Sequence, residues 1–338
     1  MKFFHKKKNV LLLSIFRLMN NKIKGYLFAA ISAVTYGMNP LFALPLYDAG
    51  MDLFSVLFFR YLIAIPILAV MLKIRRRDFS IEKSDFIPLI ILGILFALSS
   101  ITLFSSYHHM DVGIASTILF VYPIMVALIM FFFFKEKISV KTMVCIAVAL
   151  FGIALLCNSG KDAVISMKGV LFVLGSALSY SIYIVFVNKS RIKKMATIKV
   201  TMYVLIVGWI IFAIRALACG TLTTPPSEKW WLWGNILALS IFPTVISLIC
   251  TTEAIQYIGS TPTAILGVLE PVTAVFFGIV VFHEAMTPHI ILGLVLIITS
   301  VTFVIAGGNI GKILLRLRKM FPKLKTNDKR LRAKDLRD

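Results

Sequence analysis

Apolar segments of about twenty residues, separated by short polar stretches, recur along the whole chain. A helix needs about nineteen or twenty such residues to cross the hydrocarbon core of a bilayer. The pattern therefore predicts ten membrane-spanning helices, at residues 25–46, 54–72, 86–105, 113–134, 142–158, 169–187, 198–218, 234–252, 263–282 and 289–307. A soluble protein does not require so many apolar runs of this length, so the pattern is typical of a multi-pass membrane protein.

Composition supports the same interpretation. Of the 338 residues, 59% are hydrophobic and 15% are charged, whereas about one residue in four is charged in a soluble domain. A formal net charge of +21 would suggest nucleic-acid binding in a soluble protein. Here the Lys and Arg residues cluster beside the apolar segments, which favours contact with an anionic membrane surface. We expect a lipid bilayer as partner and no nucleic acid.

The distribution of basic residues predicts the orientation in the membrane. If the N-terminus is cytosolic, the cytosolic segments hold 31 Lys and Arg residues and the outer loops hold 4. Basic loops stay on the cytosolic side of a membrane. We therefore expect a protein of the cytoplasmic membrane whose basic ends, residues 1–24 and 311–338, are both cytosolic. The short apolar run Val10 to Phe16 has no small-residue cleavage site after it, which favours a segment at the membrane surface over a signal peptide.

Two internal correspondences predict a duplication. The segment Lys24–Tyr36 returns 144 residues later as Lys168–Tyr180, with seven of thirteen positions identical. A Pro and a Glu thirteen residues apart, Pro123 and Glu136, recur 148 residues later as Pro271 and Glu284. Two correspondences at nearly one offset indicate a repeated unit of five helices, one in residues 25–158 and one in residues 169–307.

Because five is an odd number, the second unit must cross the membrane in the opposite sense to the first. The loop charges agree, since the basic loop around Lys135 corresponds to a loop without Lys around Glu284. The predicted fold is an all-α integral membrane protein with about ten transmembrane helices in two inverted five-helix repeats. Such repeats are typical of secondary transporters, which bind substrate between the repeats near the membrane midplane.

The order and spacing of these features resemble the EamA-type transporters of the drug/metabolite transporter superfamily. The stretches that carry the resemblance are Phe59–Ala64 (FRYLIA), Ala115–Pro123 (ASTILFVYP) with Lys135-Glu136, and Ile265–Pro271 (ILGVLEP) with His283-Glu284. The resemblance covers about residues 25–307. It implies an exporter of amino acids, other metabolites or toxic organic compounds that works by alternating access, and it does not choose among these substrates.

One carboxylate is predicted near mid-membrane. Glu270 lies about eight residues into the ninth span, on a helix face shared with the small residues Gly267, Thr273 and Ala274. Ionisable residues cost roughly 2.5–3.5 kcal/mol each to insert at this depth, so their presence suggests a function. Glu270 is therefore a candidate for binding a cationic group or for proton coupling. The alternative is a structural hydrogen bond at the bend made by Pro271.

Hydroxyl and aromatic residues form a stripe that occurs in both halves. Ser32, Tyr36 and Asn39 share one face of the first span, and Ser176, Tyr180 and Tyr183 repeat the spacing in the sixth. Tyr122 occupies the position that corresponds to Glu270. These seven residues and Glu270 are the predicted substrate-binding set, which Ser99 and Ser247 could extend. Tyr also anchors helices at membrane interfaces, so each Tyr alone has that alternative.

The remaining polar residues of the spans favour structural roles. We expect Arg60, six residues from the outer start of span two, to extend its side chain to the outer interface. Glu253 is expected at the inner interface, with a gating pair to a cytosolic Lys or Arg as the alternative. Glu136 and Glu284 end their helices and are expected to contact loops. Four hydroxyl residues, Ser100, Thr102, Ser105 and Ser106, are expected to bond to their own or a neighbouring helix.

No enzyme or metal motif competes with transport. The sequence has no GxxxxGK[ST], HExxH or GxSxG pattern, so we expect no catalysis, no cofactor and transport driven by an ion gradient or the substrate's own. A lipid or isoprenoid transferase would need clustered carboxylates or histidines at mid-membrane. The adjacent His108 and His109 are expected in solvent, and the four Cys residues lack metal spacing. The alternative is a sensor or structural membrane protein that has the transporter fold. The sequence also leaves open whether the protein forms a homodimer.

Overall fold

The computed structural model describes residues 21–135, 140–157, 166–220, 222–258, 263 and 266–306. Every regular element in these residues is a helix. In chain order the elements are α2 (Asn21–Gly37), α3 (Asn39–Asp48), α4 (Leu53–Ile74), α5 (Lys83–Ser106), α6 (Val112–Leu119), α7 (Tyr122–Phe134), α8 (Val140–Cys157), α9 (Met167–Lys189), η1 (Arg191–Lys194), α10 (Thr197–Cys219), η2 (Ser227–Lys229), α11 (Leu232–Ser240), the π-helix η3 (Ile241–Ile246), α12 (Ser247–Ile258), α14 (Leu269–Phe282) and α15 (Pro288–Ala306). Residues 1–20 of the predicted basic N-terminal end (residues 1–24), the predicted basic C-terminal end (residues 311–338) and Glu136 lie outside the described residues.

The helices are long and apolar enough for a membrane. Seven segments of the described chain have the length and composition to cross a bilayer, namely Asn21–Asp48, Leu53–Ile74, Lys83–Ser106, Val112–Phe134, Met167–Val187, Thr197–Cys219 and Leu232–Ile258. Three more apolar helices are shorter, Met143–Leu156, Leu269–Phe282 and Pro288–Phe303. The prediction of an all-helical, multi-pass membrane protein is confirmed.

Several predicted spans are not the single helices that the hydropathy pattern suggested. The first is divided at Met38 between α2 and α3, and another at Phe120 and Val121 between α6 and α7. A Pro lies in the first turn of each second piece, Pro40 and Pro123. Since Pro has no N–H and its ring clashes with the preceding turn, it starts a helix more readily than it continues one. Irregular backbone is tolerated at membrane depth where it is buried in protein or lines a cavity.

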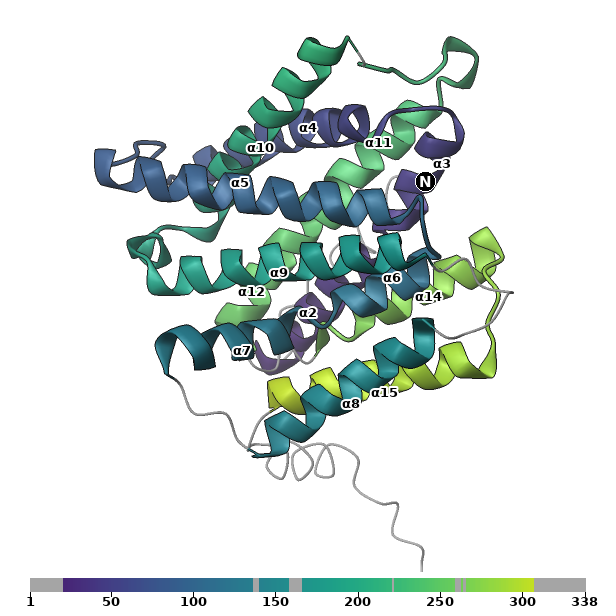
Figure 1. Ribbon diagram of the computed structural model, residues 1–338. Coiled ribbons are helices and arrows are strands. Elements are labelled where there is room, and N and C mark those ends of the chain that lie inside the picture. Colours follow the sequence, from purple (N-terminus) through teal and green to yellow (C-terminus); the bar gives the residue numbers. More distant parts are fainter. Residues whose placement is uncertain are drawn as a thin grey trace, which may run out of the picture.

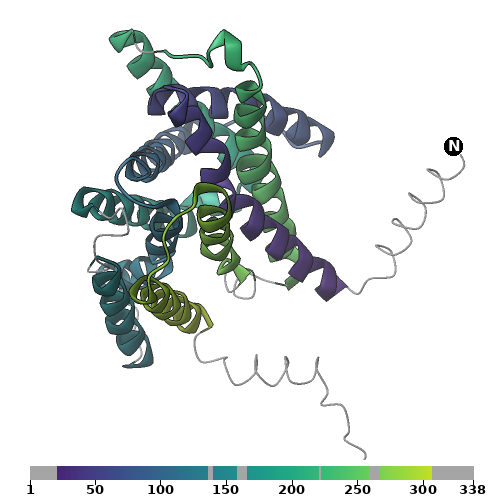
Figure 2. The same cartoon turned by 90° about the vertical axis from the view of Figure 1, so that its right-hand side faces the viewer.

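The two halves of the chain pack against each other through pairs of helices. α5 packs on α9, α2 on α12, α4 on α10 and α8 on α15, and Figure 1 shows these pairs running across the view. Each pair joins a helix before residue 158 to a helix after residue 166. The pair α8 and α15 lies at one edge of the bundle, away from α4 and α10 (Figure 2). There a Cβ added at Gly293 would lie 2.9 Å from the carbonyl oxygen of Gly152, so the absence of side chains permits this close approach.

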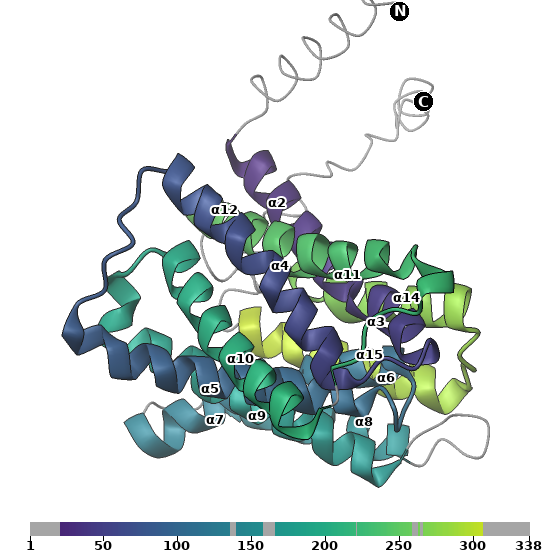
Figure 3. The ribbon, with the colours of Figure 1, turned by 90° about the horizontal axis from the view of Figure 1, so that it is seen from above.

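The two ends of the bundle differ in charge. At one end α2, α5 and α10 begin and α4, α7, α9 and α12 end, and this end carries Lys73, Arg75, Arg191 and Lys194. We call it the basic end. Figure 3 shows α4 and α10 lengthwise between the two ends. At the opposite end α3 finishes at Asp48 and α4 begins with a cap, the Asp52 carboxylate accepting from the backbone N–H of Phe54 at 3.0 Å.

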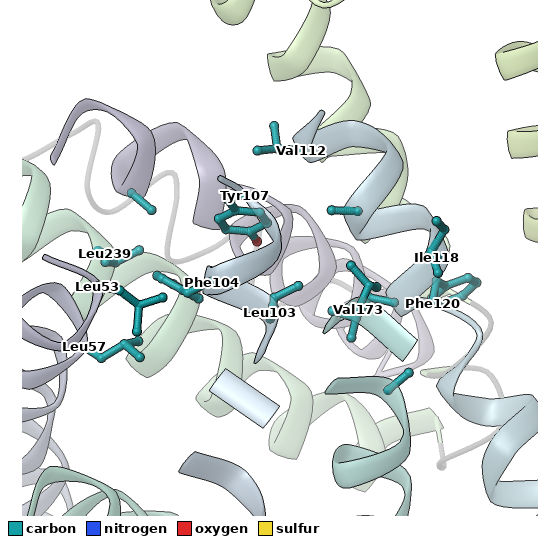
Figure 4. Packing of buried hydrophobic residues seen from close by; sticks show 14 of the residues in the cluster. Leu53, Leu57, Leu103, Phe104, Tyr107, Val112, Ile118, Phe120, Val173 and Leu239 are labelled. Atoms are coloured by element: carbon teal, nitrogen blue, oxygen red, sulfur yellow. The ribbon is translucent and has the colours of Figure 1, made fainter. Parts of the chain in front are cut away.

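Tightly packed apolar side chains fill the bundle near the opposite end. They come from α3, the start of α4, the end of α5 and the start of α6, and we call them the closing cluster: Leu46, Leu53, Leu57, Leu103, Phe104, Tyr107, Met110 and Val112. Figure 4 shows Leu103, Phe104 and Tyr107 of this cluster close together. Each side chain of the closing cluster is at most 7% exposed, so the cluster separates the interior of the bundle from the solvent at the opposite end.

Candidate functional site

A cavity of about 730 Å³ lies at the centre of the bundle. This volume falls within the range of roughly 300–1,000 Å³ that is typical of small-molecule sites. Its lining reaches Met130, Thr201 and Ile255, each within about a turn of the basic end. In the other direction the lining stops at Arg60 and Tyr36, beneath the closing cluster. The cavity therefore opens toward the basic end and is closed toward the opposite end.

Most of the predicted binding residues meet in this cavity. Its lining includes Ser32, Tyr36, Tyr122, Tyr180, Tyr183 and Glu270, together with Ser99 and Ser247. Tyr122 begins α7 and Glu270 lies in the first turn of α14, so each follows a helix interruption. Interrupted helices of this kind bring polar groups to the membrane midplane in transporter folds.

One wall of the cavity is aromatic. The rings of Tyr122 and Tyr180 meet edge to face with centroids 5.0 Å apart, and Tyr180 stacks on Tyr183 at 5.9 Å. Phe96 of α5 extends the wall, its ring centroid 5.5 Å from that of Tyr183. Phe96 was missed by the sequence reasoning, which looked for polar groups alone. The wall offers ring faces and edges to an apolar or aromatic ligand group.

The two stripe serines join helices rather than extend the aromatic wall. The Ser32 hydroxyl of α2 donates to the carbonyl oxygen of Ser247 in α12 at 2.9 Å and still borders the cavity. Ser176 of α9 is fully buried, and its hydroxyl donates to the carbonyl oxygen of Ser99 in α5 at 2.8 Å. The structure therefore places Ser176 in a helix contact outside the cavity lining, because α9 packs directly on α5 at this position.

Asn39 lies beside a second, much smaller cavity. This space of about 10 Å³ is lined by Tyr36, Asn39, Tyr107, Ser116 and Glu270 among others, between the main cavity and the closing cluster. The amide nitrogen of Asn39 donates to the carbonyl oxygen of Tyr36 at 2.8 Å, while its buried amide oxygen has no hydrogen-bond partner. A space of this size holds about one water molecule. Asn39 thus faces the neighbourhood of Glu270 and not the main cavity.

Glu270 faces both cavities, at the point where α14 crosses α2. Among the described residues, none donates a hydrogen bond to its carboxyl group. Gly37 makes the crossing possible, since a Cβ at this position would lie 2.4 Å from the Glu270 carbonyl oxygen. A structural hydrogen bond from the Glu270 side chain was the alternative role, and no partner for such a bond is found among the described residues.

The prediction for Arg60 is wrong. Its side chain is only 6% exposed and turns into the cavity wall instead of extending to the interface. Nε donates to the hydroxyl of Thr244 at 3.0 Å, and the guanidinium carbon lies 5.3 Å from the centre of the Phe104 ring. The Thr244 hydroxyl in turn donates to the carbonyl oxygen of Leu239, at 3.1 Å, within the π-helical turn. Arg60 lies about 10 Å along α4 from its first residue, and a charge this deep was a signal of function.

The outlying carboxylates make contacts at the two ends of the bundle. Glu253 accepts from Nη2 of Arg75 at 2.8 Å, the pairing with a basic residue that the sequence left as the alternative. Glu284 accepts from the backbone N–H of Val112 at 2.5 Å and of Gly113 at 3.2 Å, at the start of α6. Glu284 therefore contacts a neighbouring loop and helix start, as predicted, while nothing is described for Glu136.

The other polar groups do not add a second site. Thr102 and Ser106 donate to carbonyl oxygens of their own helix, and Ser100 bonds with the hydroxyl of Tyr61 at 2.7 Å, as predicted for such groups. His108 is exposed against the ring of Tyr47, but His109 is half-buried and stacks on Phe172, so the prediction of two solvated histidines holds for His108 alone. The described residues contain no group of three or more metal-ligating side chains.

Comparison with known proteins identifies the architecture. The model of the EamA-like transporter family matches residues 23–158 and again residues 167–306. A protein named uncharacterized transporter YoaV, from Bacillus subtilis (strain 168), is 27% identical over 285 residues, which cover 81% of this chain and 90% of that protein. An uncharacterized transporter of Clostridium kluyveri is 25% identical over 287 residues, covering 81% and 91% of the two chains.

A solved crystal structure shares the fold. It superposes with a TM-score of 0.61 at 15% sequence identity and covers 87% of this chain and 98% of its own. At this level of identity the likeness concerns the fold alone.

Proposed function

The chain belongs to the EamA-like transporter family, within the drug/metabolite transporter superfamily, and from this we propose that it is a secondary transporter that exports a small molecule across the cytoplasmic membrane. The observation that carries the proposal is the central cavity, which has the size of a small-molecule site, holds an unbonded carboxyl group and is open at only one end. In an alternating-access mechanism the binding site is open to only one side of the membrane in each end state, and a cavity open at one end meets this requirement.

The proposal includes ten spans in two inverted repeats, residues 25–158 and 169–307. The family model matches two segments with nearly these bounds, and long and short apolar helices are present for every predicted span. The basic end is taken as cytosolic because Lys and Arg are retained on that side of a membrane. The described conformation is then the inward-facing one, with the closing cluster as the outer barrier.

Glu270 supplies the coupling step of the proposal. Its carboxyl group reaches the main cavity and the small polar cavity behind it. A carboxyl group in such a place can hold a proton in one conformation and release it in the other. Export of a substrate can then be exchanged for a proton that enters on the same residue.

A transport assay with the pure protein tests the proposal. We expect proteoliposomes that contain the full chain to accumulate at least one compound from a panel of amino acids, other metabolites and organic cations, when a pH difference is imposed. Liposomes without protein provide the control. If no compound of the panel moves, while the same preparation binds one of them, the chain is a sensor with the transporter fold and the proposal is wrong.

The aromatic wall should contribute directly to substrate affinity. Tyr36→Ala and Tyr180→Ala each remove a ring that lines the cavity, and we expect the apparent affinity to fall by roughly 2- to 10-fold, as for the loss of one aromatic contact. Leu27→Ala on α2 is the matched control, because Leu27 is 42% exposed on the outer surface of the bundle. Uptake kinetics and membrane yield are the measurements. Unchanged affinity in both Tyr variants would assign the stripe to packing.

A further inference from the structure

The small cavity behind Glu270 is bordered by two oxygen acceptors that have no donor. The Asn39 side chain is only 3% exposed; its amide nitrogen donates to the carbonyl oxygen of Tyr36, and its amide oxygen has no partner. The Glu270 carboxyl group lines the same space, and none of the described residues donates to it. Two acceptors around a space of about 10 Å³ require an occupant that is positively charged or donates a hydrogen bond to each of them.

The charge of an ionised Glu270 is not compensated by the described protein. The ion pair found among the described residues is Arg75–Glu253, so Arg60 forms none with Glu270. A water molecule can bond to both acceptors, but it carries no charge and leaves the carboxylate uncompensated, which is costly away from bulk water. The other ionisable groups that line the two cavities do not change charge near neutral pH, namely Arg60, Tyr36, Tyr107, Tyr122, Tyr180 and Tyr183. A single positive charge in the small cavity would neutralise Glu270.

The size and the oxygen atoms of the small cavity restrict which cation this is. A space that holds about one water molecule excludes an organic ammonium ion. A divalent ion such as Ca²⁺ takes about six to eight oxygen ligands and would leave an excess charge beside one carboxylate. Na⁺ carries a single charge and is bound in transporter folds by oxygens at helix interruptions. Asn39 directly follows such an interruption, between α2 and α3, and the hydroxyl residues Ser116 and Tyr107 line the same space.

We propose that the small cavity binds one Na⁺ ion between the carboxylate of Glu270 and the amide oxygen of Asn39, with the hydroxyl groups of Ser116 and Tyr107 as further ligands. Its role in transport rests on the proposed function, because Na⁺ then takes the place of the proton as the coupling ion. The two ions exclude each other, since Na⁺ binds only the ionised carboxylate.

The position of the small cavity gives Na⁺ a route in each end state. Leu103 and Tyr107 belong both to its lining and to the closing cluster, so opening of the cluster admits an ion from the opposite end. In the described conformation that way is closed, and Glu270 also borders the main cavity, which opens toward the basic end. Na⁺ can therefore enter from one side and leave to the other in exchange for exported substrate.

Binding of radiolabelled Na⁺ to the full chain in lipid nanodiscs tests the site, with scintillation proximity at pH 8 as the measurement. We expect saturable binding that unlabelled Na⁺ displaces. The same concentration of K⁺, whose longer distances to oxygen need a wider space, or of the bulky N-methyl-D-glucamine should not displace it. Glu270→Gln should abolish the saturable binding. Asn39→Leu should weaken it by roughly 10- to 100-fold, the range for an oxygen that bonds to a charged group.

Ser116→Ala and Thr117→Val form a matched pair of variants on α6. Ser116 lines the small cavity, whereas the Thr117 hydroxyl is fully buried, donates to the carbonyl oxygen of Gly113 and lines neither cavity. We expect Na⁺ affinity to fall roughly 2- to 10-fold in Ser116→Ala and to stay unchanged in Thr117→Val. This pair keeps the test independent of Asn39→Leu, which also loses the bond to Tyr36. An equal loss in both α6 variants would assign the effect to packing and overturn the site.

Three results on binding would also overturn the inference: no saturable Na⁺ binding by the wild type, equal displacement by K⁺, and unchanged affinity in Asn39→Leu. Transport is measured separately, and a Na⁺ gradient at equal pH should drive accumulation of the compound found in the proteoliposome panel. If that compound accumulates under a pH difference while the protein binds no Na⁺, the proposed function stands and the Na⁺ site fails. If Na⁺ binds and no compound of the panel moves, the site stands and the transport function fails.

Discussion

Glu270→Gln should abolish substrate accumulation driven by a pH difference while preserving substrate binding and passive exchange. Gln keeps the shape of Glu, but it cannot take up or release a proton. Coupling is therefore lost, while the cavity that Glu270 lines stays intact. Proteoliposomes with an imposed pH difference measure accumulation, and counterflow of labelled substrate at equal pH measures exchange.

Glu253→Gln is the matched control for this experiment. Glu253 is also a carboxylate of the second half, but its side chain is at the basic end in an ion pair with Arg75. A pair of this kind at the surface contributes only about 0–1 kcal/mol, so its loss should leave accumulation close to that of the wild type. If Glu270→Gln still concentrates substrate under the same pH difference, Glu270 is not the coupling residue, and transport is either facilitated or coupled elsewhere.

The sequence was sufficient to predict the fold class and the residues that recur at a regular helical spacing. Hydropathy depends on local composition alone, so the apolar segments could be located directly from the sequence. Tyr36 and Tyr180 were found because they recur in both halves at the same helical spacing, and Glu270 because it is a carboxylate deep in an apolar segment. Each of these three residues lines the cavity in the structure.

The wrong predictions concern the direction of a side chain, which the spacing of residues along a helix does not determine. The depth of Arg60 along its helix could be read from the sequence. The direction of its side chain depends on Thr244 and Phe104, which lie in other segments of the chain. Ser176 has the same spacing as Ser32, and both are used to join helices. Ser32 lies beside the interrupted segment before α12 and so also borders the cavity, whereas Ser176 meets a continuous α5. Which neighbour a face meets is decided by tertiary packing.

The helix interruptions explain why the cavity lies at the centre of the bundle. Hydropathy averages over a whole span and cannot show that α6 and α7 are separate pieces or that η3 is a π-helix. Each interruption frees backbone polar groups or exposes the start of a helix. The three interruptions lie beside Tyr122, Glu270 and Thr244 respectively. The residues that sequence reasoning connected to function are therefore placed at the irregular points of the fold, where a ligand can reach polar groups.

Opening of the closing cluster should be easier above pH 7 than below it, because of Glu284. Burial raises the pKa of Glu284 to about 7, against the opposing effect of the backbone N–H groups of Val112 and Gly113, and the nearby carboxylate of Asp111 raises it further. When the opposite end opens, water reaches the carboxyl group and its pKa falls toward the ordinary value of about 4.3. Because Glu284 binds the proton more tightly in the closed state, protonation stabilises the closed state relative to the open one. This stabilisation is full at low pH and is lost as the pH rises through about 7.

The measurement is the rate at which a membrane-impermeant thiol reagent labels a Cys at Met110, in a variant without the native Cys residues. Met110 is 3% exposed within the closing cluster, so labelling requires opening. The exposed Ser227→Cys at the same end gives the intrinsic pH dependence of the reagent, and its labelling in intact cells also tests the proposed orientation. Relative to this control, we expect labelling at Met110 to rise roughly 30-fold from pH 5.5 to pH 8, because linkage changes the equilibrium between closed and open states about tenfold for each pH unit below the pKa of about 7.

Glu284→Gln should remove this pH dependence and keep labelling at or below the slow rate that the wild type shows at pH 5.5. Gln is always neutral, as Glu284 is when protonated, and its amide oxygen still accepts from the N–H of Val112. The exposed neighbour His283 provides a control, because it is adjacent to Glu284 in the chain but makes no contact with the start of α6 that the described residues show. If His283→Gln removes the pH dependence and Glu284→Gln preserves it, the outer barrier does not respond to Glu284. In the expected case a proton released from Glu284 accompanies each outward opening, and transport slows when the outside is acidic.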